Sequence, residues 1–373
     1  MKFKIKKEIL LDSLNNVSKA VSTKNVIPVL GGINFDLKEE GLYLTSTNNE
    51  IDIQTFIDKK FIDSIEELGS IVIKGKYLLE IVRKLPSGLI NIEVVDGLKI
   101  ILYNETSNFN LNGIDSDEFP NLNIKTSNNP IVISKKVLKN VINQTIFATS
   151  MQESRPILTG INFKIENNKM ECVATDSYRL SKKIVNLDEN INNLINIVIP
   201  AKNISELLKI IDEKEDDVKL HIFSNKVLFE FDSILFQSRL LNGNFPDTSR
   251  LIPTEFKFEI KADLEELYQV IDRASLLTSE KEKNVIKFET NNNTLIISSN
   301  TPEIGRVEEK LSISKNIEED IKIAFSSKYM MDALKTISSK NVTIKLNTDV
   351  SPIIINNEED ENLIELLLPI KTY

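Results

Sequence analysis

Hydrophobic and polar residues alternate in two rhythms at the start of the chain. Short segments such as Lys2–Lys6 and Gly41–Thr45 alternate with a period of two, which is typical of strands with one buried face. Between these two segments, apolar residues recur at the spacing of an amphipathic helix: Ile9, Leu10, Leu14 and Val17. The chain therefore opens with a predicted strand, a predicted helix and further predicted strands.

This succession occurs three times. The segment 28–35 matches the segment 156–163, and most of the eight positions are identical. A fainter third copy begins at Ile286, where Ile286-Lys287-Phe288 aligns with Ile33-Asn34-Phe35. Two further blocks repeat in the same order: Lys76–Val82 with Lys328–Leu334, and Glu118–Asn121 with Asn244–Asp247. Because the blocks keep near-constant offsets, we predict three homologous domains over residues 1–127, 128–255 and 256–373.

Each repeat contains two predicted helices and many strands. The helical segments are residues 6–20, 74–86, 134–148, 200–212, 261–275 and 326–338. Strands are predicted on both sides of them, among them Lys169–Val173, Ile90–Val94, Lys219–Phe223 and Asn341–Leu346. Many strands with only two helices per unit favour an α+β fold, in which the helices cover one face of antiparallel sheets.

Charge is divided unevenly between the helices and the rest of the chain. The net charge is −9, yet the six helical segments together carry +6, which leaves −15 elsewhere. A lysine recurs near the start of the second helix in each repeat: Lys76, Lys202 and Lys328. The helix dipole disfavours a cation there. Solvated helix faces would explain lysines in general, but their recurrence favours a function toward an anionic partner.

The size of a ring lined by these helices indicates which partner would fit. Packed helix axes lie about 8–10 Å apart, so six helices would enclose a circle only about 19 Å across. Twelve helices would give about 38 Å between axes and roughly 25–28 Å free of side chains. A B-form duplex, about 20 Å wide, fits only the larger ring. Two chains would therefore be needed, and a ring held by topology needs few phosphate contacts.

Composition and motifs argue against several other classes of protein. No apolar run reaches the roughly 20 residues that span a bilayer, and the first residues lack the apolar core of a signal peptide. The lone Cys172 excludes an internal disulfide framework, and we expect a cytoplasmic protein without a membrane partner. His221 is the only histidine and lies in a predicted strand, so a Ser/His/Asp triad is disfavoured. Gly75-Lys76 lacks the other residues of a phosphate-binding loop. We expect no catalytic residue, metal or cofactor.

Several segments resemble the bacterial DNA sliding clamp, the beta subunit of DNA polymerase III. They are Met1-Lys2-Phe3, Pro28-Val29-Leu30, Ala174–Leu180, Asn244–Asp247 and the C-terminal Leu366–Tyr373. The resemblance extends over the whole chain in length and motif order. It implies a non-catalytic processivity factor, in which two three-domain chains form a head-to-tail ring with helices inside and sheets outside. Duplex DNA would be encircled without sequence preference.

The resemblance also implies a peptide pocket between the second and third domains. The polymerase III catalytic subunit, the clamp loader and repair proteins would insert a short Gln/Leu/Phe-type motif there. The matching positions are Leu158, Thr175, Ser177, Tyr178, Arg179, Leu180, Pro246, Arg250, Leu251, Ser326, Tyr329, Val350, Leu366, Leu367, Leu368, Pro369 and Ile370. Leucine and proline walls can bury an apolar anchor, while Arg179 and tyrosine edges can bind polar peptide groups. For Leu366–Leu368, an ordinary core strand is the alternative interpretation.

Two further sets of residues follow from the same resemblance. The family's DNA-facing positions correspond to Lys24, Lys76, Gln152, Arg155 and Lys202. The homodimer interface corresponds to Phe109 and Leu111 on the first domain and to Leu276 and Leu277 on the third. Phe109 and Leu111 alternate, as a strand requires if both are to lie on one face. A buried edge strand would give the same pattern.

The chain departs from the family at a few of these positions. Ser177-Tyr178 stands where the family often has Gly-His, and Ser249-Arg250 stands where it often has Arg-Arg. Pro156 and Ile157 replace two tyrosines of other members. A repeat scaffold that binds proteins but not DNA remains an alternative hypothesis, against which the basic helices argue.

Overall fold

A computed structural model describes residues 1–22, 27–212, 216–279, 283–302 and 304–371. The chain divides into two compact units, which are residues 1–136 with 202–240 and residues 137–201 with 241–373. We call them unit 1 and unit 2. The second repeat contributes to both units, because its strands join sheets of the first repeat and of the third repeat.

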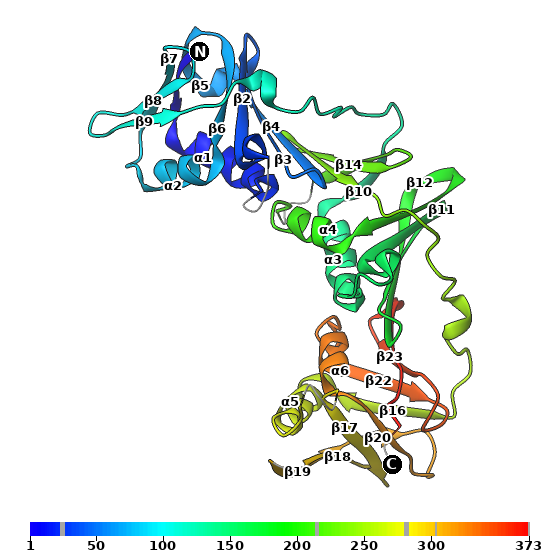
Figure 1. The fold of residues 1–373 in the computed structure, drawn as a ribbon. Helices are drawn as coiled ribbons and strands as arrows, with labels where there is room; N and C mark the ends of the chain where they lie inside the picture. Colours follow the sequence, from blue (N-terminus) through cyan, green and yellow to red (C-terminus); the bar gives the residue numbers. More distant parts are fainter. Residues whose placement is uncertain (23–26, 213–215, 280–282, 303, 372–373) are drawn as a thin grey trace. The chain divides into compact units, whose positions relative to one another are not determined.

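The described residues form six α-helices, two in each repeat (Figure 1). They are α1 (Lys7–Val17), α2 (Gly75–Lys84), α3 (Lys135–Thr145), α4 (Ala201–Leu208), α5 (Leu264–Ser275) and α6 (Ser327–Leu334). All six lie within the predicted helical segments. The buried residues of α1 are Leu10, Leu14 and Val17, which is the apolar face predicted from their spacing.

Unit 1 contains two antiparallel sheets. The five-stranded sheet has the order β5 (Ile62–Glu67), β1 (Lys2–Lys6), β7 (Leu89–Val95), β8 (Lys99–Tyr103) and β9 (Asn108–Asn112). The eight-stranded sheet has the order β10 (Ile131–Ser134), β13 (Asp217–Ile222), β14 (Lys226–Phe231), β15 (Ile234–Arg239), β4 (Ile51–Asp58), β3 (Gly41–Thr47), β2 (Gly32–Lys38) and β6 (Gly69–Lys74). The pairing of β15 with β4 joins the second repeat to the first in one continuous sheet.

Unit 2 has a similar construction. Its seven-stranded sheet has the order β11 (Gly160–Thr175), β12 (Arg179–Pro200), β24 (Asp360–Leu367), β23 (Ile353–Asn357), β22 (Asn341–Leu346), β16 (Phe258–Asp263) and β20 (Ser314–Lys315). Its four-stranded sheet has the order β19 (Gly305–Ser312), β18 (Thr294–Thr301), β17 (Val285–Asn291) and β21 (Lys322–Ser326). Here β12 pairs with β24, which joins the second repeat to the third.

In the first and third repeats the helices cover one face of the strands. In the third repeat α5 and α6 lie side by side and contact β16–β18 and β21 (Figure 1). Their apolar residues pack with those of the strands, for example Leu267 and Met330 with Phe288. Three helix–strand repeats with antiparallel pairing confirm the predicted α+β class. No helix in the described part of the chain is long and apolar enough to cross a membrane.

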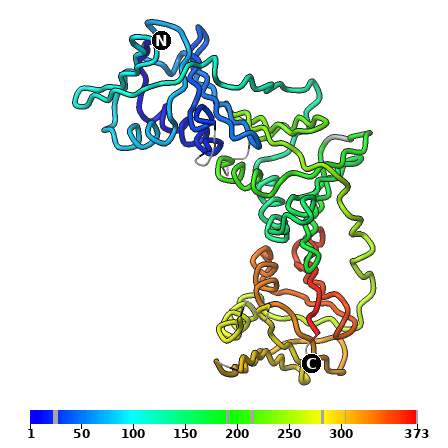
Figure 2. Tube along the Cα trace, in the orientation of Figure 1, coloured from blue at the N-terminus to red at the C-terminus, as the bar shows by residue number. Residues whose placement is uncertain are grey.

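Extended segments follow the last strand of the first and second repeats (Figure 2). In unit 1 the segment after β9 contributes Phe119 to a small apolar cluster with Val29, Leu30 and Val72. In unit 2 the segment after β15 carries Phe245 and Ile252, which pack on Val173, Leu180 and Leu366. Both segments thus cover the sheet on the side away from the helices. The strand residues that they contact alternate along each strand with the residues that face the helices.

Candidate functional site

The largest of the described hollows, about 710 Å³, opens in unit 2 beside the C-terminal segment. It is lined by Tyr178, Lys283, Asn284, Ser326, Lys328, Tyr329, Leu368, Pro369, Ile370 and Lys371. Six of these are among the seventeen residues predicted for the peptide pocket. The four that were not predicted are Lys283, Asn284, Lys328 and Lys371. The volume lies in the range of ligand sites that take small molecules or short peptide segments.

The C-terminal segment forms one wall of this hollow and is held by two sheets. The Leu368 backbone N–H donates to the Tyr178 carbonyl oxygen at 2.9 Å, which extends the pairing of β24 with β12. Two residues later, the Ile370 N–H donates to the Ala324 carbonyl oxygen at 2.7 Å, on the edge strand β21. The segment therefore crosses from one sheet of unit 2 to the other. The two hydrogen bonds hold its backbone in place and so position its apolar side chains.

A tight turn between β11 and β12 presents Tyr178 to the hollow. The Asp176 Oδ1 oxygen accepts backbone N–H bonds from Tyr178 and Arg179 at 2.9 and 3.0 Å. The Thr175 hydroxyl accepts from the Ser177 N–H at 3.1 Å and donates to the Arg179 carbonyl oxygen at 2.6 Å. Ser177 has φ +78°, a region that favours glycine, which explains the glycine often found here in the family. Tyr178 itself is exposed.

Arg179 lies beneath the hollow and supports Tyr329. Its Nε donates to Asp176 Oδ2 at 3.0 Å and its Nη1 donates to Asp332 Oδ2 at 2.7 Å. The guanidinium lies 4.3 Å from the centre of the Tyr329 ring and 5.2 Å from that of Phe147. Since Arg179 is only 9% exposed and its Nε and Nη1 groups bond these two carboxylates, it acts chiefly by positioning Tyr329.

Replacing Arg179 by alanine should destabilise unit 2. The change leaves two carboxylates without their cation and removes the planar group against Tyr329, so we expect a loss of about 2 kcal/mol. That corresponds to roughly 4–8 °C in the melting temperature of a domain of this size. As a control, Arg83→Ala removes an exposed pair with Glu80 and should change stability by less than about 0.5 kcal/mol. Equal melting temperatures for native and Arg179→Ala proteins would contradict this role.

The other predicted pocket residues are not part of the lining of this hollow. Leu158, Thr175 and Leu180 are buried, whereas Ser177, Pro246, Arg250 and Leu251 are exposed. Val350 lines a second hollow of about 590 Å³ in unit 2. Leu366 and Leu367 lie in β24 and belong to the core, so the core-strand interpretation holds for these two. Leu368 follows the strand, is 39% exposed and lines the hollow.

The whole chain matches the DNA polymerase III beta subunit. The models of the N-terminal, central and C-terminal domains of that subunit match residues 1–123, 132–247 and 249–371. The chain belongs to this family, the beta sliding clamps. It is 42% identical to the beta sliding clamp of Bacillus subtilis over 378 residues and 40% identical to that of Staphylococcus aureus over 377, with all of each chain covered.

Solved structures of beta sliding clamps have the same fold. The crystal structure of the Bacillus subtilis sliding clamp is 41% identical to this chain and superposes with a TM-score of 0.96 over all of both chains. A Pseudomonas aeruginosa sliding clamp bound to griselimycin is 25% identical, with a TM-score of 0.94 over all of both chains. Family membership makes this chain a processivity subunit without catalytic activity of its own. Its role is in DNA replication.

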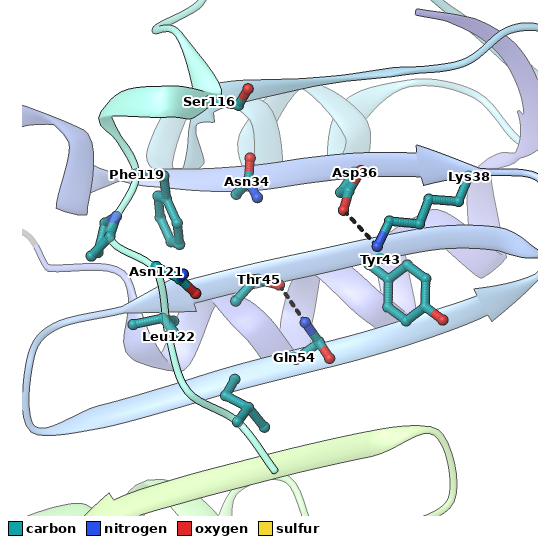
Figure 3. A pocket seen from close by; sticks show the side chains of 12 residues that line it. Asn34, Asp36, Lys38, Tyr43, Thr45, Gln54, Ser116, Phe119, Asn121 and Leu122 are labelled. Atoms are coloured by element: carbon teal, nitrogen blue, oxygen red, sulfur yellow. Dashed lines mark hydrogen bonds and ion pairs between the residues drawn. The ribbon is translucent and has the colours of Figure 1, made fainter.

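The first repeat of this clamp chain has a cavity of its own, on the face of β2–β4 that the segment after β9 covers. Figure 3 shows it between β2–β4 and the extended segment that carries Phe119 and Leu122. Its volume is about 400 Å³, and its floor is polar: Gln54 donates to Thr45 at 3.0 Å. Thr45 stands where the second repeat has the buried Val173. An apolar anchor would therefore be poorly accommodated in this cavity.

Glu365 is a buried carboxyl group next to the pocket strands. Its Oε1 accepts from the Ser181 and Thr336 hydroxyls, both at 3.0 Å, and Oε2 has no hydrogen-bond partner among the described residues. Burial raises the pKa of the Glu365 carboxyl well above its usual range, although the two hydroxyls act in the opposite direction. The folded clamp therefore holds a proton at Glu365 that the unfolded chain releases at lower pH.

This proton predicts a specific pH dependence of stability. The native state binds more protons than the unfolded state between the ordinary glutamate pKa, about 4.3, and the raised one. The contribution of Glu365 to stability then falls as pH rises through this window, by up to about 1.4 kcal/mol per pH unit. Glu365→Gln should remove this slope, whereas Glu361→Gln, an exposed control in the same strand, should retain it. Urea unfolding at pH 5 and pH 8 measures it, and identical slopes for native and Glu365→Gln proteins would contradict it.

His221 connects the segment before β10 to strands β13 and β14. Its Nδ1 accepts the Ser127 backbone N–H at 2.9 Å, and its Nε2 lies 2.9 Å from Glu230 Oε2. These contacts fix the segment between the first and second repeats to β13. Lys226 also contacts the carbonyl oxygen of Asn123 in the same segment. Both ring nitrogens of the only histidine therefore have structural partners, and Cys172 is a buried free thiol.

The predicted DNA-facing residues lie on helices and an exposed loop. Lys76 and Lys202 are exposed second residues of α2 and α4, and Gln152 and Arg155 are exposed before β11. Arg155 Nη1 donates to the Ser177 hydroxyl at 3.4 Å. Lys24 lies outside the described residues.

The residues predicted for the dimer interface lie at two sheet margins. Phe109 and Leu111 are half-buried in β9, the edge strand of the five-stranded sheet. Leu276 and Leu277 follow α5, and Leu276 is 75% exposed. The edge strand β19 of the four-stranded sheet is contacted by α5.

Proposed function

We propose that two copies of this clamp chain close head to tail into a ring around duplex DNA. The ring would tether the polymerase III catalytic subunit, the clamp loader and repair proteins through short peptide segments bound in unit 2. Three homologous domains, with boundaries near residues 127 and 255, would come from each chain. The observation that carries the proposal is the repeated pairing of strands across the repeat junctions, which leaves the junction strands β9 and β19 without such a partner among the described residues.

The two junctions within the chain use equivalent strands in the same register. In unit 1 the first repeat meets the second where Ile53 of β4 pairs with Phe236 of β15. In unit 2 the second repeat meets the third where Ser181 of β12 pairs with Glu365 of β24. Phe236 pairs with Phe229 inside its own repeat as Glu365 pairs with Ile355, so the two junctions correspond residue by residue.

The same rule predicts a third junction, between chains. The counterpart of Ile53 and Ser181 in the third repeat is Val307 in β19, which pairs with Ser299 as Ile53 pairs with Ser46. The counterpart of Phe236 in the first repeat is Phe109 in β9, which pairs with Leu102. Among the described residues β19 pairs only with β18, and β9 pairs only with β8. We therefore expect Val307 of one chain to face Phe109 of a second copy.

The residue after α5 supports this assignment. Phe147 follows α3 in the second repeat, where it packs on the core of the third repeat. Leu276 follows α5 at the corresponding position and is largely exposed in the single chain. A large apolar side chain at the margin of an unpaired sheet edge is the usual mark of an interface. Leu276 and Leu277 would pack against the first repeat of the second copy.

Binding to DNA would use the helices and would be weak. Lysine is the second residue of α2, α4 and α6, and Lys76, Lys202 and Lys328 are all exposed. A cation in the first turn opposes the helix dipole, so its repetition favours an anion outside the chain. Sparse contacts of this kind, with Lys24, Gln152 and Arg155, give sequence-independent attraction that permits sliding.

Retention on DNA tests the encircling function directly. The chain is loaded onto a nicked circular plasmid by a clamp loader, and half of the sample is then cut once to give a linear duplex. We expect the protein to remain with the circle during gel filtration and to leave the linear DNA through its ends. Equal retention on both DNAs would mean that binding depends on contacts and not on topology. Equal loss from both would also contradict a closed ring.

A further inference from the structure

Two basic hollows lie on either side of the C-terminal segment in unit 2. Lys283, Lys328 and Lys371 line the 710 Å³ hollow, and no carboxylate lines it among the residues that the structure describes. Lys287, Lys322 and Lys371 line the 590 Å³ hollow, together with the single acid Asp349. Ile370 and Lys371 belong to both linings. In a chain with a net charge of −9, this margin is unusually rich in cations.

Most of these lysines have no carboxylate partner in the described part of the chain. Lys322 forms an ion pair with Glu289 at 2.9 Å. Lys283, Lys287, Lys328 and Lys371 form no ion pair within the described residues. Unpaired cations around an apolar hollow attract an anionic ligand over a distance of about 8 Å at physiological ionic strength. The apolar wall contributed by Leu368, Pro369 and Ile370 would bind an anchor, and the lysines would bind what flanks it.

We infer that this site selects partner segments in which acidic residues flank the apolar anchor. The inference rests on the proposed peptide-binding function and names the partner chemistry of the same site. A carboxylate on one side of the anchor would reach Lys283, and one on the other side would reach Lys287 and Lys371. Lys328 shares the position of Lys76 and Lys202 at a helix start, so it is left outside this assignment.

The test compares three synthetic peptides with one Gln/Leu/Phe-type core and glutamate, glutamine or lysine flanks. Fluorescence anisotropy measures their binding to the full-length native protein. We expect the glutamate peptide to bind roughly tenfold more tightly than the glutamine peptide at low salt. The advantage should shrink at high salt because the pairs are exposed. Equal affinities for the two peptides would overturn the inference, whereas binding of none of the three would contradict the peptide site itself.

A triple variant assigns the effect to the named lysines. Lys283→Gln, Lys287→Gln and Lys371→Gln together should reduce the ratio of the glutamate-peptide affinity to the glutamine-peptide affinity from roughly tenfold to about one, with both affinities measured on the same variant. The control changes three exposed lysines outside the site, Lys99, Lys125 and Lys169, to glutamine and loses the same charge. It should keep the preference. A preference that survives in the first triple variant would overturn the inference. So would a loss of retention on circular DNA in that variant, because the lysines would then serve DNA.

Discussion

Leu276→Asp is expected to convert the proposed dimer into monomers. Leu276 is 75% exposed in the single chain, so an aspartate there leaves the fold of unit 2 intact. In the proposed ring the same position is buried against a second copy, where loss of an apolar anchor and burial of a charge cost about 3 kcal/mol or more. The dimer dissociation constant should then rise by at least about 100-fold. Sedimentation velocity at micromolar concentration measures it.

The matched control is Leu194→Asp, which makes the same substitution at a 58% exposed leucine outside the proposed interface. It should remain dimeric. Cysteines then test the register: Asn110→Cys with Arg306→Cys occupies positions that face each other one step from the pair Phe109 and Val307. This double variant should form disulfide-linked dimers under oxidation, whereas Asn110→Cys with Val307→Cys should not. A dimeric Leu276→Asp protein, or crosslinking of the second pair alone, would refute the predicted junction.

The local elements follow from sequence because their causes are local. The strand predicted at Asn341–Leu346 has the same bounds in the structure, since its alternation is uninterrupted. The helix predicted over residues 134–148 ends at Thr145 and continues as a 3₁₀ turn to Ala148. Apolar spacing does not distinguish a 3₁₀ turn from the last turn of an α-helix, because both bury similar positions. Repeat number, and with it the class of fold, was therefore predictable.

The site was only partly predictable because it depends on pairing between distant strands. Tyr178 and Leu368 carry family motifs, so the resemblance identified them. Asn284 belongs to no family motif. It reaches the hollow because the neighbouring Val285 pairs with Ser326, and the Ser327 N–H donates to the Asn284 carbonyl oxygen at 2.9 Å. The same holds for the adjacent Lys283. The two junction pairings, β4 with β15 and β12 with β24, are likewise non-local, and no periodicity within one strand specifies them.

Tyr329→Ala is expected to abolish binding of partner peptides without loss of the ring. Tyr329 lines the hollow on α6, and its ring lies against the Arg179 guanidinium. Burial raises the pKa of its phenol, so the ring stays neutral and amphipathic at physiological pH. Aromatic residues in such pockets contribute about 2–4 kcal/mol to binding, which predicts a 30- to 1,000-fold loss of affinity for a Gln/Leu/Phe-type peptide. Anisotropy titration measures it.

The control for this change is Tyr43→Ala, which removes a tyrosine from the polar cavity of the first repeat. Peptide affinity should be unchanged there, because that cavity lacks the apolar wall formed by the C-terminal segment. Both variants should remain dimeric and stay on circular DNA, since neither residue lies at a sheet edge proposed for the ring. If Tyr329→Ala bound peptide normally while Tyr43→Ala did not, the peptide pocket would belong to the first repeat, and the argument from the apolar wall of unit 2 would be wrong.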